Sequence, residues 1–526
     1  MNAMDANRRV MTRPTDYGRA VSRRVARRLV ACTLALGGAL AAYHFVLMWL
    51  MRHAGLVLGV VRPSEKVYRL VPLYCEMDPP HRLNPGLLAV VGLLVMFWRW
   101  LSRVAWDPRR LRRGFVPAAM AWYVALACLV AMIDGGPSRI GRPYEKLRET
   151  DYLGAVGRVE SVGHFLSHYT ELQPSLPLHC RTHPPGGILF LCAIEHWGWP
   201  GATAAALATI FFAALAVPAV HGLAREVGTR RTARLATVLF LLAPNVLLFT
   251  ATSMEAVFMA PMIWTFYLLF RATRERPVVL GFAGGLTASA AAFMTFSAAW
   301  LAIWAVMTAV LVVLIDRRRM RNTLLAMAGA AAASLAFHGL LYLASGYNPW
   351  AVLGKALGQH TQIMSGGNQT TLRQYLHMTV ANPIAFFAGT GLVLAVLWAA
   401  RTWSDAREGF ANTFTTRHDS SPSYSGRNVA GRLLNLSFLG SLAVVALAPL
   451  YTLEVERIWI FLVPLVAIAA ARELQKGSEL FSVRLGKDRA NVAGINSSDP
   501  FLAVRATFVL LAGQTVLMEA LLDTLW

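Results

Sequence analysis

Residues 297–315 read SAAWLAIWAVMTAVLVVLI, a stretch without a single charged side chain. Such a run is typical of a transmembrane helix, because about 20 apolar residues cross the hydrocarbon core of a bilayer. Similar runs of apolar residues recur along all 526 residues, of which 56% are hydrophobic and only 15% are charged. Soluble domains usually carry about 25% charged residues. The sequence therefore predicts an all-α polytopic integral membrane protein and excludes a cytosolic enzyme, a disordered chain and a disulfide scaffold.

Hydropathy predicts about thirteen transmembrane helices. These spans are 29–51, 86–101, 115–133, 202–224, 235–251, 256–271, 278–294, 297–315, 323–344, 383–400, 433–451, 457–471 and 501–522. The first span follows a basic arm, as the apolar part of a signal peptide does, but it is long enough to cross the membrane. The span 278–294 is rich in glycine and alanine, which favours close packing between helices over lipid contact.

Basic residues set the predicted orientation, because arginine and lysine collect in cytoplasmic loops. The chain has 50 Lys and Arg against 28 Asp and Glu, and the arm before Leu29 is assigned to the cytoplasm. The apolar stretch 186–199 is short for a span, and counting it as one would place every later basic cluster outside. We interpret it as a juxtamembrane helix, interfacial or re-entrant, on the outer face. The segments 134–201 and 345–382 are then outside, and 401–432 is a flexible cytoplasmic loop.

The net charge of +22 is thus explained by topology and does not indicate nucleic-acid binding. The sequence has no P-loop and no other sign of a nucleotide-binding domain. No CxxC pair occurs, so no metal or redox motif is predicted from the cysteines. The five cysteines are Cys32, Cys75, Cys128, Cys180 and Cys192.

Unusual polar residues fall on the predicted outer face, although they come from distant parts of the chain. They are Asp134, Asp151, Tyr152, the motif LPLHCRTHPPGG at 176–187 with Arg181 and His183, Glu255, Lys355, and the motif EVER at 454–457 with Glu456 and Arg457. Such a cluster on one side of the membrane is typical of a single active site at the outer leaflet. The proline after His183 restricts that residue to extended geometry, which favours a binding role at the membrane surface.

Several of these residues also fit simpler interpretations. Asp134, at the end of a span, fits an ordinary interfacial residue, and Arg457 between acidic neighbours fits an interfacial ion-pair cluster. His164 and His168 are spaced so that they could share a helical face as metal ligands. No third ligand lies at a suitable spacing, so we favour solvated loop residues.

The motifs resemble those of the GT-C superfamily of polytopic glycosyltransferases, and specifically the lipid-linked-sugar enzymes related to protein O-mannosyltransferases and aminoarabinose transferases. Asp151-Tyr152 matches an acidic residue and tyrosine in the first large outer loop, and His183-Pro184-Pro185 matches an HPP motif that opens a juxtamembrane helix. Two weaker matches are Pro244 with Glu255, and Glu456-Arg457 with Pro464. The resemblance covers roughly 115–471. The sequence departs from the family pattern in three ways: it has extra spans in 29–114, Tyr152 stands where a second carboxylate is common, and no large C-terminal outer domain is expected.

The resemblance implies four parts: a basic cytoplasmic arm (1–28), two extra N-terminal spans (29–114), a GT-C-like catalytic module (115–471), and a cytoplasmic loop with a final span (472–526). It implies transfer of a sugar from a polyprenyl-phosphate donor to a lipid, glycan or protein acceptor, with inversion. Asp151 or Asp134 would be the general base. The residues expected to bind substrate or lipid phosphate are His183, Arg181, Arg457, Tyr152, Glu255, Glu456 and Lys355.

No obligatory cofactor is expected, and a divalent metal would be useful for the phosphate but is not predicted. The expected location is a bacterial inner membrane, with the active site facing the periplasm.

Three alternative functions remain open: a non-catalytic membrane protein of cell-envelope assembly, a lipid or solute transporter, and a polymerase or ligase of polysaccharide repeats. Transporters usually show internal repeats, broken helices and charges at the middle of the membrane, and we find no such repeat in the sequence.

Overall fold

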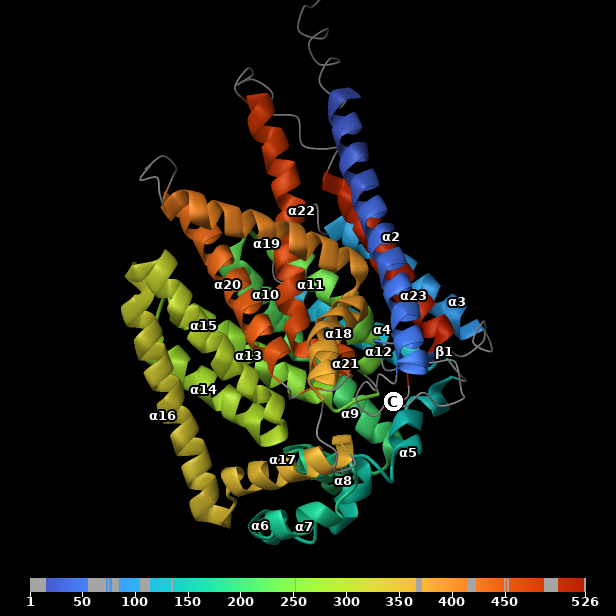
Figure 1. Ribbon diagram of the computed structural model, residues 1–526, viewed down its shortest axis with the longest axis vertical. Coiled ribbons are helices and arrows are strands. Elements are labelled where there is room, and N and C mark those ends of the chain that lie inside the picture. The colour runs from blue at the N-terminus through green and yellow to red at the C-terminus, as the bar shows by residue number, and fades with distance from the viewer. Residues whose placement is uncertain are drawn as a thin grey trace, which may run out of the picture.

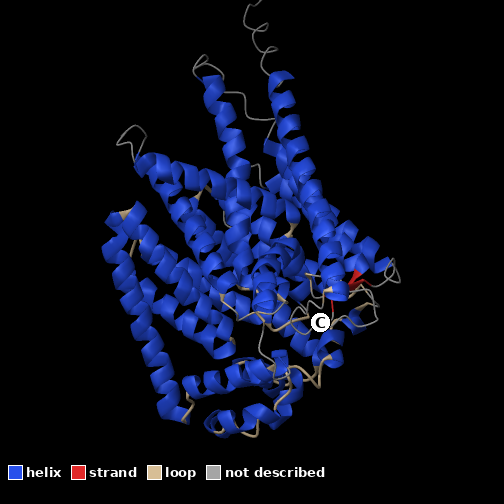
Figure 2. Cartoon of the chain, in the orientation of Figure 1, coloured by secondary structure: helices blue, strands red, loops and turns tan. Residues whose placement is uncertain are grey.

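A computed structural model describes residues 16–54, 72–73, 75–77, 85–104, 114–133, 136–250, 252–365, 371–413, 422–448, 451, 454–486 and 500–524. The described chain is almost entirely helical, as predicted (Figure 2). One short antiparallel ladder is added to the predicted all-α fold. It joins β1 (Cys75–Met77) to β2 (Leu522–Thr524), with Cys75 opposite Thr524.

Eight helical segments within the described ranges are long and apolar enough to cross a membrane, so the chain is an integral membrane protein. They are formed by α2 (Asp16–His53), α3 (Pro85–Val104), α9 (Ala202–Ala214) together with α10 (Ala216–Val227), α14 (Pro277–Met294), α15 (Ala299–Ile315), α16 (Met320–Ser345), α20 (Pro422–Leu447) and α23 (Pro500–Leu521). The number rises to ten if two bent helix pairs each count as one span. The structure does not confirm the predicted number of thirteen. Three further helices lie in the predicted spans 115–133, 256–271 and 457–471: α4 (Phe115–Ala131), α13 (Glu255–Ala272) and α22 (Val463–Gly486).

Two predicted spans are not straight helices. The span 235–251 divides into α11 (Arg230–Leu241) and α12 (Pro244–Thr250), which are bent by 54°. Pro244 causes this break, because proline disfavours helical geometry in the residue before it. The span 383–400 divides into α18 (Leu372–Thr390) and α19 (Leu392–Thr413), bent by 113°. Gly391 lies between them with φ 121°, a backbone conformation that favours glycine.

Two further expectations about local structure are corrected. The predicted span 457–471 begins instead with a single turn, α21 (Val455–Ile458), and the 3-10 turn η7 (Ile460–Leu462), before α22 starts. The predicted flexible loop 401–432 is helical on both sides of residues 414–421, which lie outside the described chain. Asp405 explains part of this order, because its buried carboxylate accepts hydrogen bonds from Arg401, Arg472 and Asn435 and so joins α19, α20 and α22.

The predicted outer segment 134–201 folds into short helices at one end of the molecule. They are η1 (Pro137–Arg139), α5 (Arg142–Lys146), η2 (Tyr152–Arg158), α6 (Val162–Ser167), α7 (Tyr169–Leu172), η3 (Gln173–Ser175), η4 (Cys180–Thr182) and α8 (Gly186–His196). Figure 1 shows α6, α7 and α8 beside α17 (Pro349–Ser365), far from the start of α2. We call this the outer end, following the distribution of basic residues. The stretch 186–199 thus contains a short helix, as predicted. Two short 3-10 turns lie near α15: η5 (Phe296–Ala298) and η6 (Arg317–Arg319).

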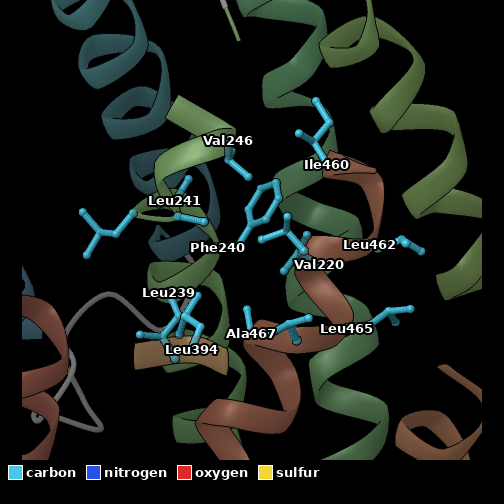
Figure 3. Close-up of a cluster of buried hydrophobic side chains, with 14 of the residues drawn as sticks. Val220, Leu239, Phe240, Leu241, Val246, Leu394, Ile460, Leu462, Leu465 and Ala467 are labelled. Carbon is cyan, nitrogen blue, oxygen red and sulfur yellow. The ribbon is translucent and has the colours of Figure 1, made fainter. Parts of the chain in front are cut away.

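The core of the bundle surrounds the break between α11 and α12. Figure 3 shows apolar side chains from α10, α11, α12, α19, η7 and α22 that pack against one another there. The labelled residues are Val220, Leu239, Phe240, Leu241, Val246, Leu394, Ile460, Leu462, Leu465 and Ala467, and all are buried. Because lipid tails are as apolar as these side chains, close packing holds such a core more than the exclusion of water does.

Candidate active site at the outer end

A buried arginine joins two carboxylates from distant parts of the chain. Arg457 on α21 donates from one terminal nitrogen to Glu255 Oε2 at 3.2 Å and from the other to Glu454 Oε2 at 2.8 Å. Arg457 is 6% exposed and Glu255 7% exposed. Burying either charge without a partner would be strongly unfavourable, so the pairing fixes both groups. The two motifs that the sequence placed separately on the outer face therefore meet directly.

Glu255 is positioned by the start of its helix. It is the first residue of α13, where the backbone N–H groups favour a negative charge. The hydroxyl of Ser253 donates to the same carboxylate oxygen that Arg457 binds. The preceding helix α12 is held to α4 by a 2.6 Å hydrogen bond between Tyr123 Oη and Thr250 Oγ1. The packing of the bundle thus sets where the Glu255 carboxylate lies.

Asp151 precedes η2 in the outer segment and is also buried, with 6% exposure. Its Oδ1 accepts a hydrogen bond from the Tyr152 backbone N–H at 2.8 Å. Burial raises the pKa of Asp151 to about 6, and the charges of Glu255 and Arg457 lie close enough to influence it. A carboxyl with this pKa is mostly ionised at neutral pH and takes up a proton readily, which suits a general base.

Two histidines of the LPLHCRTHPPGG motif face the same cluster. His183 has φ −128° and ψ 158°, the extended geometry that the following proline predicts. Its Nδ1 donates to His179 O at 2.9 Å, and Tyr169 Oη donates to His183 O at 2.9 Å. With the proton on Nδ1, the neutral ring has its lone pair on Nε2.

Both imidazoles are held in the neutral form. Burial lowers the pKa of His183. Burial, reinforced by the charge of Arg457, lowers the pKa of His179 to about 3. The two rings therefore add no positive charge to the cluster at neutral pH, and one guanidinium faces the carboxyls of Asp151, Glu255 and Glu454.

Tyr152 connects the Asp151 turn to the histidine motif. Its ring meets His183 edge-on at a centroid distance of 5.8 Å and Phe258 of α13 at 6.0 Å. Gly187 makes this contact possible, because a Cβ added there would lie 2.8 Å from a carbon of the Tyr152 ring. The two glycines that follow the HPP motif therefore have a packing role: an added Cβ at Gly186 would lie 2.4 Å from Phe293 O.

The remaining predicted site residues lie in other surroundings. Arg181 donates from Nε to Leu176 O at 2.6 Å, and Lys355 is exposed on α17. Glu456 is buried beside Gly389 of α18, and its backbone carbonyl accepts a hydrogen bond from Asn245. Asp134 lies outside the described residues. Among the residues that the structure describes, Asp151 is the predicted base that lies near the Arg457 cluster.

Sequence reasoning assigned no binding or catalytic role to three residues of the outer segments. His179 stands four positions before His183, and Glu454 stands three before Arg457, so local spacing alone was a usable signal for both. His360 on α17 is close enough to His183 for its charge to influence that ring. No local signal links His360 to the site, because only the fold brings α17 over the histidine motif.

His164 and His168 remain at the surface. Their rings stack at 4.4 Å, and both side chains are exposed. In the part of the chain that the structure describes, no three His, Cys, Asp or Glu side chains gather in a metal-binding arrangement.

The sequence matches no protein-family model and no curated protein. Solved structures that are similar to this chain include archaeal oligosaccharyltransferase AglB from Archaeoglobus fulgidus in complex with an inhibitory peptide and a dolichol-phosphate, at 12% identity and a TM-score of 0.45. That match covers 78% of this chain and 56% of the archaeal chain, so this chain spans little more than half the length of the archaeal enzyme. ArnT from Cupriavidus metallidurans bound to undecaprenyl phosphate is also similar, at 12% identity, a TM-score of 0.44 and 77% coverage of both chains. The structural similarity to both proteins is distant.

Proposed function

We propose that this chain transfers a sugar from a polyprenyl-phosphate donor to an acceptor hydroxyl at the outer face of the membrane. The observation that carries the proposal is the buried ion pair between Arg457 and Glu255, from distant segments, with the buried Asp151 close enough for their charges to influence it. A buried general base beside a buried guanidinium is the pair of groups that this reaction needs.

Asp151 would act as the base. The acceptor oxygen attacks the anomeric carbon, the bond from that carbon to the phosphate oxygen breaks, and the configuration inverts. The hydroxyl proton passes to the Asp151 carboxylate, and the phosphate leaves with the electron pair of the broken bond. The raised pKa of Asp151, about 6, leaves the carboxylate ionised at neutral pH and still basic enough to accept this proton.

Arg457 would stabilise the leaving phosphate. Its planar guanidinium matches phosphate oxygens in a fixed geometry, and Glu255 and Glu454 hold it in place before substrate arrives. His183 can add a second donor only after its Nε2 takes up a proton, which an approaching phosphate would favour. Arg181 and Lys355 are further cations, while Glu255 and Glu456 would orient the sugar or pair with the cations.

The remaining partners follow from the same reaction. The prenyl chain would lie against the apolar helices, and the acceptor is a lipid, a glycan or a protein. The proposed location is a bacterial inner membrane with the site facing the periplasm. The proposal includes no obligatory metal.

The experiment is transfer of a labelled sugar from a panel of short-chain polyprenyl-phosphate sugars to membrane extracts. We expect Asp151→Asn to reduce transfer by about a hundredfold or more, the usual contribution of a general base. Asp134→Asn is measured in parallel. Glu160→Gln is the matched control, because Glu160 is an exposed carboxylate of the same outer segment. Transfer that is robust in the wild type and unchanged in Asp151→Asn would contradict the assignment of the base.

A lipid or solute transporter is the second candidate, because two spans are broken. The charged cluster lies at the junction with the outer helices, whereas transporters place such groups near the middle of the membrane. Movement of a polyprenyl phosphate across sealed vesicles, measured without any sugar transfer, would favour the transporter. If neither movement of the lipid nor transfer of the sugar is observed, the result favours a non-catalytic envelope protein.

A further inference from the structure

The last helix, α23, bridges the break between α18 and α19 with one side chain. Gln514 accepts a hydrogen bond from the Leu392 N–H through Oε1 at 2.9 Å and donates from Nε2 to Ala388 O at 2.7 Å. These backbone groups lie on opposite sides of Gly391. Inside a membrane, backbone groups released by a helix break must find other partners, because lipid offers none. The side-chain amide of Gln514 supplies an acceptor for the Leu392 N–H and a donor for the Ala388 carbonyl.

Two neighbours of Gln514 on α23 complete the contact. Leu511 occupies the space that a side chain at position 391 would need, since a Cβ added to Gly391 would lie 2.4 Å from Leu511 Cδ1. The hydroxyl of Thr515 lies 3.3 Å from Leu242 O, a carbonyl at the break between α11 and α12. It also lies 3.1 Å from Leu511 O, so the two carbonyls share its proton. Both broken spans therefore meet the same two turns of α23.

The two breaks lie next to the turn that carries Arg457. Asn245 is the second residue of α12, directly after the break that follows α11. It donates from Nδ2 to Glu456 O at 3.0 Å. Gly389, next to the Ala388 carbonyl that Gln514 binds, packs against the Cβ of Glu456. A shift of either broken helix would thus move α21, and with it the Arg457 guanidinium.

We propose that Gln514 is a positioning residue for Arg457: its amide fixes the α18–α19 break, and that break fixes the α21 turn. The inference rests on the proposed function, because it assigns Arg457 the role of binding the lipid phosphate. It gives the final span, which lies outside the part of the sequence that resembles GT-C enzymes, an indirect part in positioning the site.

The first test is amide hydrogen exchange on the full chain in lipid nanodiscs. We expect Gln514→Leu to raise exchange at residues 388–392 and also at 454–458. Thr507→Val is the matched control, because Thr507 lies buried on the same helix and its hydroxyl donates within that helix, to Ala503 O. Gln514→Asn, which keeps the amide but shortens its reach, is the second variant in case Gln514→Leu does not fold. Exchange at 454–458 that is unchanged in the folded variant would overturn the proposal.

The second test measures binding of farnesyl phosphate to the same nanodiscs. We expect about tenfold weaker binding in Gln514→Leu, the ratio that corresponds to the loss of one good polar contact. The loss should shrink in an Arg457→Lys background, because the effect of Gln514 passes through Arg457. Equal losses in both backgrounds would show a merely structural role and overturn the inference. If the wild type binds no farnesyl phosphate, the proposed function fails, and the exchange result alone decides whether Gln514 positions the turn.

Discussion

At the scale of single residues, the buried carboxyl of Asp151 predicts the pH dependence of the reaction. Burial raises its pKa to about 6. A general base must be ionised, so the rate of sugar transfer should fall as the pH falls through 6 and should level off above about 7. Initial rates at saturating donor between pH 5 and pH 8 measure this. Tryptophan fluorescence at each pH shows that the protein stays folded. A rate that is constant from pH 5 to pH 7 would contradict the role of Asp151.

The sequence predicted a set of candidate site residues at this scale, and the structure adds the ion pairs between them. Asp151, His183, Glu255 and Arg457 were all predicted from their types and their place on the outer face. The sequence proposed Asp151 or Asp134 as the base; the structure adds that Asp151 is buried near the charges of Glu255 and Arg457, while Asp134 lies outside the described residues. The sequence suggested acidic partners for Arg457, but only the structure shows that Glu454 and Glu255, the latter 202 positions away, share its guanidinium.

At the scale of helices, the contact between α14 and α16 depends on the absence of side chains. An added Cβ at Gly285 would lie 2.4 Å from Ala330 O on the facing helix. Gly285→Ala should therefore destabilise the protein by about 1–3 kcal/mol, the usual cost of overpacking a close contact. Thermal unfolding of the purified protein in detergent, at a fixed scan rate, measures the change.

Gly339→Ala is the control for this prediction. Gly339 lies on α16, and an added Cβ there would meet nothing within 4 Å. Alanine is the better helix former, by up to about 1 kcal/mol, so this change should leave stability unchanged or slightly higher. If Gly285→Ala is no less stable than Gly339→Ala, the packing of α14 against α16 is not as close as the structure shows.

Helix position was easier to predict than helix continuity. The short helix α8 and the spans of α14 and α16 follow from local composition. The breaks at residues 242–243 and at Gly391 were missed, although Pro244 and Gly391 are local signals. A glycine or proline in a membrane helix does not break it by itself, because the released backbone groups need partners elsewhere. Here those partners come from α23, more than a hundred residues away in sequence.

At the scale of the whole molecule, the orientation in the membrane is the decisive prediction. Single cysteines introduced as Glu160→Cys and Arg318→Cys both replace exposed side chains, one near the candidate site and one in the basic turn before α16. A membrane-impermeant maleimide added to intact cells should label the first cysteine and not the second, because basic loops face the cytoplasm. Unsubstituted protein gives the background from the native cysteines.

Permeabilised cells are the control for this labelling, since both cysteines should then react. Labelling of Arg318→Cys alone in intact cells would place the candidate site in the cytoplasm. The donor would then be needed on the cytoplasmic side, and the proposed reaction at the outer face would be wrong.

The sequence by itself determined that this protein is a helical membrane protein and where most of its helices lie, and it predicted a set of polar residues at one face. Runs of apolar residues and clusters of arginine act through the bilayer, which every part of the chain meets in the same way. Only the tertiary structure decided where two spans break, how Arg457 is shared between two carboxylates, and that the last helix contacts both breaks. These features depend on side chains that meet across long separations in sequence, and no local pattern encodes which partners will satisfy a buried charge or a released backbone group.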